Sequence, residues 1–537
     1  MKIDKPTKLF LFACIAALAL HVATMKLCPL PWMDEVHIVE MGRLLLDGNS
    51  MSETILTQSD GSAFLPVYYL GPCLQEFCFR AGGFAGVRLS PMIGLLIATM
   101  LFYFWLRLDR KMSSADAALL AAVVLTMPLF VQSTRQVRVD TWCMSCAFAV
   151  FLLVDVPAGA RFRFARLCLS GVIVALSPFV WPSSVFFIPL YIWIYMFCAR
   201  ANGFSRKAVL RDLLIVGMTV CLAGVVLMLP VVPTLRSMIK SLFGYFHMYG
   251  GHHVDIEKSF ASIVIDILKG PCVLAVKETL RAPFVFAVFA MAMVGAGMRH
   301  RMLAVLFALA LCFGMASGLH AYRFIYLLPY LIVAVVLLVQ ETKWRRTVHV
   351  LLFAAVAYGI FTGFLAYGVA AVVHAKDRDP VAFRKALAEG VGRGARRVYS
   401  GSYEIYYVAR ELGWTQLAYS DPDPYVDDMS RANLIAKADA VLLNHKKPFS
   451  AVEETYTLLG VVRGWALQAA RKEAQRDTKS ILATIGTAFS SGLEDECKLN
   501  LLRDACQRQG KSLISQVPVP EDYEPITVYA RESCRSL

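Results

Sequence analysis

The chain has 537 residues, of which 57% are hydrophobic and 18% are charged, and its mean hydropathy is +0.56. This composition excludes a soluble enzyme and indicates a protein that crosses a membrane many times. The segment from Lys376 onward has 23 basic and 22 acidic residues, so +13 of the net charge of +14 lies in the first 375 residues. Basic residues beside membrane spans record topology, so this charge does not indicate nucleic-acid binding.

Eleven apolar runs predict membrane-spanning helices, since one crossing takes about 20 residues. The first run follows Lys2, Lys5 and Lys8 and has no small-residue cleavage site after it, so we expect a helix there rather than a signal peptide. The predicted spans are 8–27, 91–106, 115–133, 141–157, 167–181, 183–199, 212–232, 283–298, 302–318, 324–340 and 348–373.

The positive-inside rule assigns the sides of these spans. With the N-terminus in the cytoplasm, the short outside connections at about 134–140, 182 and 319–323 hold only Arg135, Arg138 and Arg323. Every short inside loop is basic, with Arg107, Arg110, Lys111, Arg161, Arg163, Arg166, Arg200, Arg206, Lys207, Arg211, Arg299, Arg301, Lys343, Arg345 and Arg346. We therefore expect a multi-pass protein of the cytoplasmic (inner) membrane, with 28–90, 233–281 and the C-terminal part on the periplasmic side.

Residues 64–80 are apolar but short, and they contain two prolines together with Gln75 and Glu76. Counting them as a span would place every later basic loop outside. We interpret them as an interfacial or re-entrant segment on the outer face, which is tolerated where the backbone is buried in protein or lines a cavity.

The C-terminal part loses the long apolar runs. Residues 395–401, 415–420 and 438–444 have the pattern of short strands, and 402–412 and 449–460 have that of helices. The sequence thus predicts a transmembrane domain at 1–375 and a periplasmic α/β domain at 376–537. Cys497, Cys506 and Cys534 are able to form one disulfide there, and the pairing stays open.

Four groups of polar residues fall on the predicted outer face. The first follows helix one, where Asp34 and Glu35 are adjacent and His37 lies one turn beyond; these acids also suit a helix N-terminus. The second is 133–143, where Arg138 and Asp140 stand between two spans. The alternative there is that Arg135 and Arg138 anchor lipid headgroups and Asp140 caps the next helix.

The third group is 317–330, with His320 and Arg323 at the start of a span, where a snorkelling arginine is the alternative. The fourth is 243–255, with His252 and His253 beside Asp255 in an aromatic loop. A metal site there is an option, but a mobile lid is favoured by the loose spacing.

Arginines bind phosphate by forked hydrogen bonds, and a carboxylate accepts the proton of an attacking hydroxyl. Together on one membrane face, they suit a lipid-linked, phosphorylated substrate and indicate glycosyl transfer. The rivals are an oligosaccharide polymerase or ligase, which the 233–281 loop favours in part, and a lipid-linked sugar flippase. A flippase needs charges near the midplane of the bundle, and these spans have few.

The motifs follow one another in a familiar order: the Asp34–Glu35 pair after helix one, LPVYYLGPCLQ at 65–75, GVRLSP at 86–91, and Arg138-x-Asp140. In this layout, residues 8–375 resemble the GT-C membrane glycosyltransferases, in the branch of the protein O-mannosyltransferases and the lipid A aminoarabinose transferase. The resemblance implies a hexosyl- or pentosyltransferase that uses a polyprenyl-phosphate-linked sugar. It also implies a glycolipid, glycan or protein acceptor, lipopolysaccharide among them.

By position, the resemblance implies that Asp34 is the general base, with Glu35 beside it, and that Asp140 is a second acid near the donor phosphate or a divalent cation. Arg138 and Arg323 would bind that phosphate. The aminoarabinose branch often has Lys-Pro-Pro-Leu where this chain has 64–67, FLPV, so Arg323, His320 or His252 would replace the missing lysine.

Overall fold

The structure is a computed structural model that describes residues 4–27, 29, 31, 33–48, 67–155, 161–236, 282–316, 324–340, 345–373, 375, 380–391, 395–400, 403–417, 438–443, 512–517 and 526–530. Compactness divides the chain into two units. The first holds Met1–Ala23, Ile38–Gly48 and Ala63–Phe364, and the second includes Thr24–His37 and Leu365–Leu537. The predicted boundary at 375/376 differs from this division, which also assigns Thr24–His37 to the second unit.

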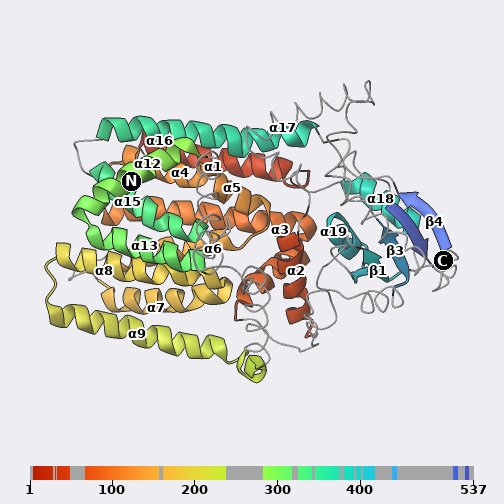
Figure 1. Cartoon of the computed structure of the whole chain (residues 1–537), viewed down its shortest axis with the longest axis horizontal. Helices are drawn as coiled ribbons and strands as arrows, with labels where there is room; N and C mark the ends of the chain where they lie inside the picture. Colours follow the sequence, from red (N-terminus) through yellow and green to blue (C-terminus); the bar gives the residue numbers. More distant parts are fainter. Residues whose placement is uncertain are drawn as a thin grey trace, which may run out of the picture. The chain divides into compact units, whose positions relative to one another are not determined.

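The apolar runs form helices because a helix satisfies its own backbone hydrogen bonds, which lipid cannot do. Figure 1 shows the long helices of the first unit side by side, with α2 running across them. The helices up to Val373 are α1 (Lys5–Thr24), α2 (Met33–Leu46), α3 (Leu70–Phe104), α4 (Ser114–Thr126), α5 (Pro128–Arg135), α6 (Asp140–Val154), α7 (Arg163–Val180), α8 (Ile188–Ala201), α9 (Arg206–Met228), α12 (Pro283–Arg299), α13 (Arg301–Ala316), α15 (Leu328–Gln340), α16 (Arg345–Gly359) and α17 (Ala366–Val373). Shorter turns of 3₁₀- or π-helix join them, among them η2 (Trp105–Asp109), η3 (Pro182–Phe187), η4 (Val232–Thr234), η5 (Ile325–Leu327) and η7 (Ile360–Leu365).

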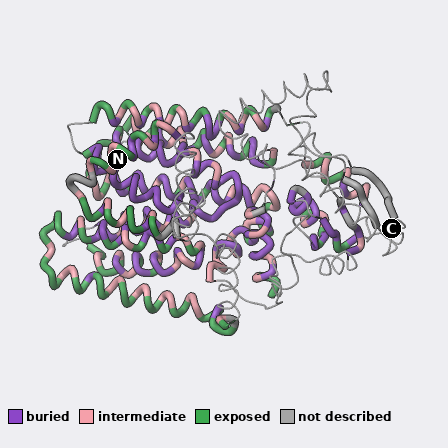
Figure 2. Tube along the Cα trace, in the orientation of Figure 1, coloured by how far each residue is buried: buried purple, intermediate pink, exposed green. Residues whose placement is uncertain are grey.

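Six helices in the described part are long and apolar enough to cross a membrane, and a seventh is added if the bent pair α4 and α5 is one span. Four further apolar helices have 10–17 residues, and they cover the other predicted spans. The protein is therefore mostly helical with at least six candidate spans, and the number of eleven crossings stays a prediction. Figure 2 shows α9 exposed along most of its length, as expected for a helix that faces lipid.

The loops predicted to lie on one side share one end of the first unit. There, Arg110 donates to Gln340 at 3.0 Å, and Asp116 at the start of α4 accepts from Arg345 at the start of α16 at 2.7 Å. Hydrogen bonds from Ser114 and Thr7 lower the pKa of Asp4 to about 2, which ties the start of α1 to the same end.

The outer connections meet at the other end of the unit, where Tyr68 packs edge-on against Trp181 and the hydroxyl of Tyr69 donates to the carbonyl of Leu227. The two ends are separated by the 15 residues of α6, which span about 22 Å. These contacts agree with the alternation that the basic loops predicted, which stays a prediction for the unit as a whole.

The segment expected at the interface is helical. Helix α3 extends from Leu70 to Phe104, but it consists of two helical halves that meet at a kink at Gly82 and Gly83, where Gly83 has φ 58°, a conformation that glycine adopts without strain. A Cβ atom on Gly86 would lie 2.2 Å from the carbonyl oxygen of Cys78, so the chain turns sharply between the two halves. That the first half is an interfacial or re-entrant segment, separate from the span predicted from 91, stays a prediction. Pro72 did not end the helix, because it lies in the first turn, where no intrahelical donor is lost.

The second unit contains a five-stranded sheet of order β2-β1-β3-β5-β4. Strand β1 (Arg397–Ser400) pairs in parallel with β2 (Thr415–Gln416) and β3 (Ala440–Leu443), whereas β5 (Ile526–Ala530) is antiparallel to β3 and to β4 (Ser512–Val517). Helices α18 (Pro380–Val391) and α19 (Glu404–Glu411) share a hydrophobic core with the sheet, made of Leu387, Val391, Ala395, Val398, Ile405, Val408, Ala409, Trp414, Ala440 and Leu442.

Strands β1, β2 and β3 and helix α19 lie within the predicted segments. The predicted helix at 449–460 lies outside the described residues. That this unit is a separate periplasmic domain stays a prediction.

Helix α2 crosses α3 at a glycine. A Cβ atom on Gly42 would lie 2.1 Å from the carbonyl oxygen of Pro72 and 2.8 Å from Cβ of Glu76. We expect Gly42→Ala to reduce the free energy of unfolding by about 1–3 kcal/mol, because the backbone of α3 cannot give way without moving the helix. Thermal unfolding of the purified protein in detergent measures the loss.

Gly217→Ala in α9 is the matched control, because nothing lies within 4 Å of a Cβ there. Alanine favours a helix over glycine by up to about 1 kcal/mol, so this variant should be as stable as the wild type or slightly more stable. Equal melting temperatures for the two variants would contradict the close packing of α2 on α3.

Candidate active site at one end of the helical bundle

The turn between α5 and α6 carries two of the predicted site residues. Helix α5 ends at Arg135, the N–H of Arg138 donates to the carbonyl of Ser133 at 3.2 Å, and Val137 has φ 57°. This is the Schellman geometry of a helix end, in which glycine usually occupies the left-handed position. A valine there costs about 1–3 kcal/mol, so the surrounding contacts must hold it.

Asp140 is fully buried at the first residue of α6, and both of its carboxylate oxygens accept hydrogen bonds. Oδ2 accepts from Nε of Arg138 at 2.7 Å and from Oγ of Ser133 at 3.0 Å, and Oδ1 accepts from the hydroxyl of Tyr326 at 2.6 Å. A buried carboxylate needs such compensation. The Arg138–Asp140 pair that the sequence indicated is therefore brought together.

The alternatives weighed for this segment do not hold. Arg135 is fully buried and Arg138 is 6% exposed, so neither side chain reaches lipid headgroups. The N-cap of α6 is Val139, which makes no side-chain capping bond, and Asp140 follows it inside the first turn. The guanidinium of Arg138 instead lies 5.8 Å from the ring centroid of Trp181. Asp140 and Trp181 thus hold the buried guanidinium of Arg138 in place.

The first half of α3 packs directly against this turn. A Cβ atom on Gly71 would lie 2.3 Å from the carbonyl oxygen of Val180 and 3.3 Å from the side chain of Val139. One turn later, Nε2 of the fully buried Gln75 donates to the carbonyl of Val137 at 3.2 Å. The segment that the sequence assigned to the interface thus forms part of the site.

Asp34 and Glu35 lie in the first turn of α2, where carboxylates interact favourably with the helix dipole. Glu35 is fully buried, and Asp34 is half-buried. The position agrees with the alternative reading of these acids as a helix start. Full burial of Glu35 goes beyond that reading, because an N-terminal acid that serves only the helix dipole has no need to leave water.

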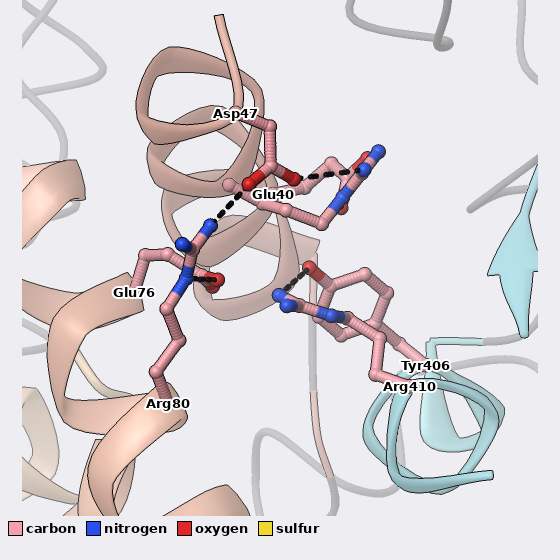
Figure 3. Close-up of polar contacts among 7 residues, drawn as sticks. Glu40, Asp47, Glu76, Arg80, Tyr406 and Arg410 are labelled. Atoms are coloured by element: carbon pink, nitrogen blue, oxygen red, sulfur yellow. Dashed lines mark hydrogen bonds and ion pairs between the residues drawn. The ribbon is translucent and has the colours of Figure 1, made fainter. Parts of the chain in front are cut away.

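Further along α2, five charged residues connect α2 to α3, and we call them the α2–α3 ladder. Arg43 pairs with Glu40 at 2.5 Å, and Arg80 pairs with Asp47 at 2.5 Å and with Glu76 at 2.8 Å (Figure 3). Arg43 and Asp47 complete the ladder at 3.6 Å. Glu40 and Glu76 are almost fully buried, so the ladder fixes α2 on α3 by charge as well as by packing.

The sequence did not single out several side chains that belong to the site. Ser133 and Tyr326 lie within the polar groups at 133–143 and 317–330, but a hydroxyl in an apolar run has no distinctive pattern. Arg88, from GVRLSP, is fully buried, and its carbonyl contacts Nε2 of the buried His21 at 2.9 Å. Histidine and arginine inside candidate spans were the available signal for these two residues.

Four predicted site residues, His252, His253, His320 and Arg323, lie outside the described residues, as do Cys497, Cys506 and Cys534. Within the described ranges, no three His, Cys, Asp or Glu side chains gather where they could hold a metal ion. Asp140 does not suit a divalent cation either, because its two oxygens already accept three hydrogen bonds, one of them from a cation.

Neither a protein-family model nor a curated protein sequence matches the chain. Solved structures do match the chain in fold. ArnT from Cupriavidus metallidurans in the apo state aligns over 82% of this chain and 94% of its own, with a TM-score of 0.51 and 12% identity. ArnT from the same organism bound to undecaprenyl phosphate aligns over 97% of each chain, with a TM-score of 0.57 and 11% identity. The chain therefore has the fold of this GT-C protein, a lipid A aminoarabinose transferase, as the resemblance implied.

The ion pair between Arg138 and Asp140 leads us to predict how two substitutions change the free energy of unfolding. Asp140→Asn removes the carboxylate 2.7 Å from a buried guanidinium and should reduce the free energy of unfolding by about 3–5 kcal/mol. Tyr326→Phe removes one hydrogen bond and should cost about 1–3 kcal/mol. Denaturant or thermal unfolding in detergent measures both.

The double variant Arg138→Gln with Asp140→Asn is the control, because it removes both charges together. Its loss should be smaller than the sum of the two single losses. Additive losses would show that the two side chains do not stabilise each other.

Proposed function

We propose that this protein is a glycosyltransferase that transfers a sugar from a polyprenyl-phosphate donor to a hydroxyl of a glycolipid, glycan or protein acceptor. The observation that carries the proposal is the pair Asp34 and Glu35 in the first turn of α2, directly after the first candidate span. The fold supports it, since ArnT shares it and one ArnT structure is bound to undecaprenyl phosphate. The proposed sugar is a hexose or a pentose.

The proposed reaction is a single displacement at the anomeric carbon. Asp34 accepts the proton of the acceptor hydroxyl, whose oxygen forms the new bond to the anomeric carbon. The bond from that carbon to the phosphate oxygen breaks, and polyprenyl phosphate leaves with the bonding electron pair. Glu35 lies beside Asp34 and assists in orienting the acceptor.

Arg138 is the proposed ligand of the leaving phosphate, together with Arg323 and His320 from the segment that opens the next span. Its burial supports this role, because a charge interaction with phosphate is stronger away from water. Asp140 accepts from Arg138 and Tyr326 and thereby holds Arg138 in place. We therefore assign Asp140 to positioning of the cation beside the donor phosphate.

We place the reaction on the outer face of the cytoplasmic membrane, with eleven crossings and the C-terminal α/β domain in the periplasm. The basic residues at the opposite end of the first unit support this orientation, because positive loops stay in the cytoplasm. The acceptors that suit this compartment are lipid A, another surface glycan, or a serine or threonine of a secreted protein.

The role of Asp34 is tested with purified protein in nanodiscs and a panel of sugars carried on tritiated undecaprenyl phosphate. Asp34→Asn should reduce release of undecaprenyl phosphate by about 100-fold or more, because a general base typically contributes 10²–10⁴ in rate. The melting temperature should change little, since asparagine has the same shape. Asp34→Glu is the matched control and should keep part of the activity.

Turnover of the asparagine variant at the wild-type rate would remove Asp34 from the role of base. Movement of the intact lipid-linked sugar across the bilayer, without release of undecaprenyl phosphate from any sugar in the panel, would favour a flippase. Transfer of whole oligosaccharides would favour a polymerase or ligase.

A divalent cation is a separate part of the proposal, and His252 with His253 is the place we propose for it. If a cation bound there takes part, EDTA lowers the rate and added Mg²⁺ or Mn²⁺ restores it. The variant with both histidines changed to alanine would then respond to neither treatment.

A further inference from the structure

We propose that Gln75 is a positioning residue, which holds the strained turn at Val137 and thereby sets the place of Arg138. The inference rests on the proposed function, in which Arg138 binds the donor phosphate. Under this inference, the first half of α3 positions Arg138, a role that its sequence did not indicate.

The turn at 136–139 is closed by backbone hydrogen bonds to the end of α5 and by Asp140, which accepts from Ser133 and Arg138, but none of these bonds involves the carbonyl of Val137. Val137 has φ 57°, a conformation that β-branched residues avoid. The N–H of Arg138 and the carbonyl of Ser133 are hydrogen-bonded, as in a Schellman turn, but a glycine at 137 would adopt this geometry without strain. A contact that fixes the peptide of Val137 from outside the turn therefore adds to these bonds.

Gln75 supplies that contact from another helix. Its side chain is fully buried, and Nε2 donates to the carbonyl oxygen of Val137 at 3.2 Å. Gly71, one turn earlier on the same face, lets α3 approach Val139 closely enough for this bond. Gln75 thus contacts Val137 and Gly71 lies against Val139, which are the residues directly before and after Arg138.

The side-chain carbonyl oxygen of Gln75 argues against a purely stabilising role for this residue. Oε1 of Gln75 is buried and has no hydrogen-bond partner among the residues that the structure describes. A buried acceptor without a partner costs free energy, and this cost offsets much of the gain from the bond to Val137. Leucine would fill the same space without that cost, so what glutamine specifically contributes is the position of the Val137 carbonyl.

The consequence for Arg138 follows from its remaining contacts. Asp140 holds the guanidinium through Nε, and Trp181 lies beside it, so its backbone is the part that depends on the turn. If the peptide of Val137 rotates away from its strained state, the Cα of Arg138 moves with it, and the guanidinium can no longer reach both Asp140 and the phosphate.

The test uses the full-length protein in nanodiscs, with undecaprenyl phosphate as the probe and its dissociation constant as the first readout. Gln75→Leu should weaken binding roughly five- to tenfold, the effect of one buried hydrogen bond, with little change in the melting temperature. Val137→Gly combined with Gln75→Leu should restore the affinity to within about twofold of Val137→Gly alone, because glycine needs no support in this conformation.

Gln416→Leu is the matched control, since the buried Gln416 also donates to a backbone carbonyl, that of Ser400, at 2.9 Å, and its strand does not belong to the site. It should leave the affinity unchanged. A Gln75→Leu protein with wild-type affinity, or one that Val137→Gly does not rescue, would overturn the inference.

A second readout separates this inference from the proposed function. Hydrogen exchange of the peptide containing the Arg138 amide should accelerate in Gln75→Leu and return to normal in the double variant. Arg138→Ala with unchanged affinity for undecaprenyl phosphate would overturn the phosphate role of Arg138, whereas unchanged exchange in Gln75→Leu would overturn the role of Gln75 by itself.

Discussion

The buried carboxylate of Asp140 is the interaction on which this end of the bundle depends. An ionised carboxylate inside an apolar assembly is stable only with a cation and hydrogen-bond donors around it. Three residues supply them: Ser133 of α5, Arg138 of the following turn, and Tyr326 of η5, directly before α15. One side chain therefore connects three segments, and the last of them, at Tyr326, lies 186 residues after Asp140 in the sequence.

Much of the bundle could be predicted because the bilayer restricts a chain so strongly. Long apolar runs have to be helical, and basic loops have to alternate, so α1, α9 and α16 fall where hydropathy places them. The extent of α3 could not be predicted in this way. Its first half contains Pro72, Gln75 and Glu76, and it is helical because tertiary contacts with the 137–139 turn and with α2 accommodate these residues.

In the site, too, some features are visible as sequence motifs, whereas others depend on tertiary packing. Adjacent acids and an Arg-x-Asp motif are visible in the sequence, so Asp34, Glu35, Arg138 and Asp140 could be chosen. The left-handed conformation of Val137 has no sequence signal, since valine is the residue least expected there. In the sheet, β1 to β3 have clear strand patterns, whereas β4 and β5 come from a stretch more than 65 residues later, and only long-range pairing places them at its edge.

The break in α3 has a mechanical consequence. A continuous helix of 35 residues would act as a rigid lever, so that a tilt imposed by the surrounding lipid at one end would displace the other end by several ångströms. Gly82 and Gly83 interrupt that lever between the longer half and the half that carries Gln75. A change in the tilt of the longer half is therefore transmitted less directly to the residues around Val137.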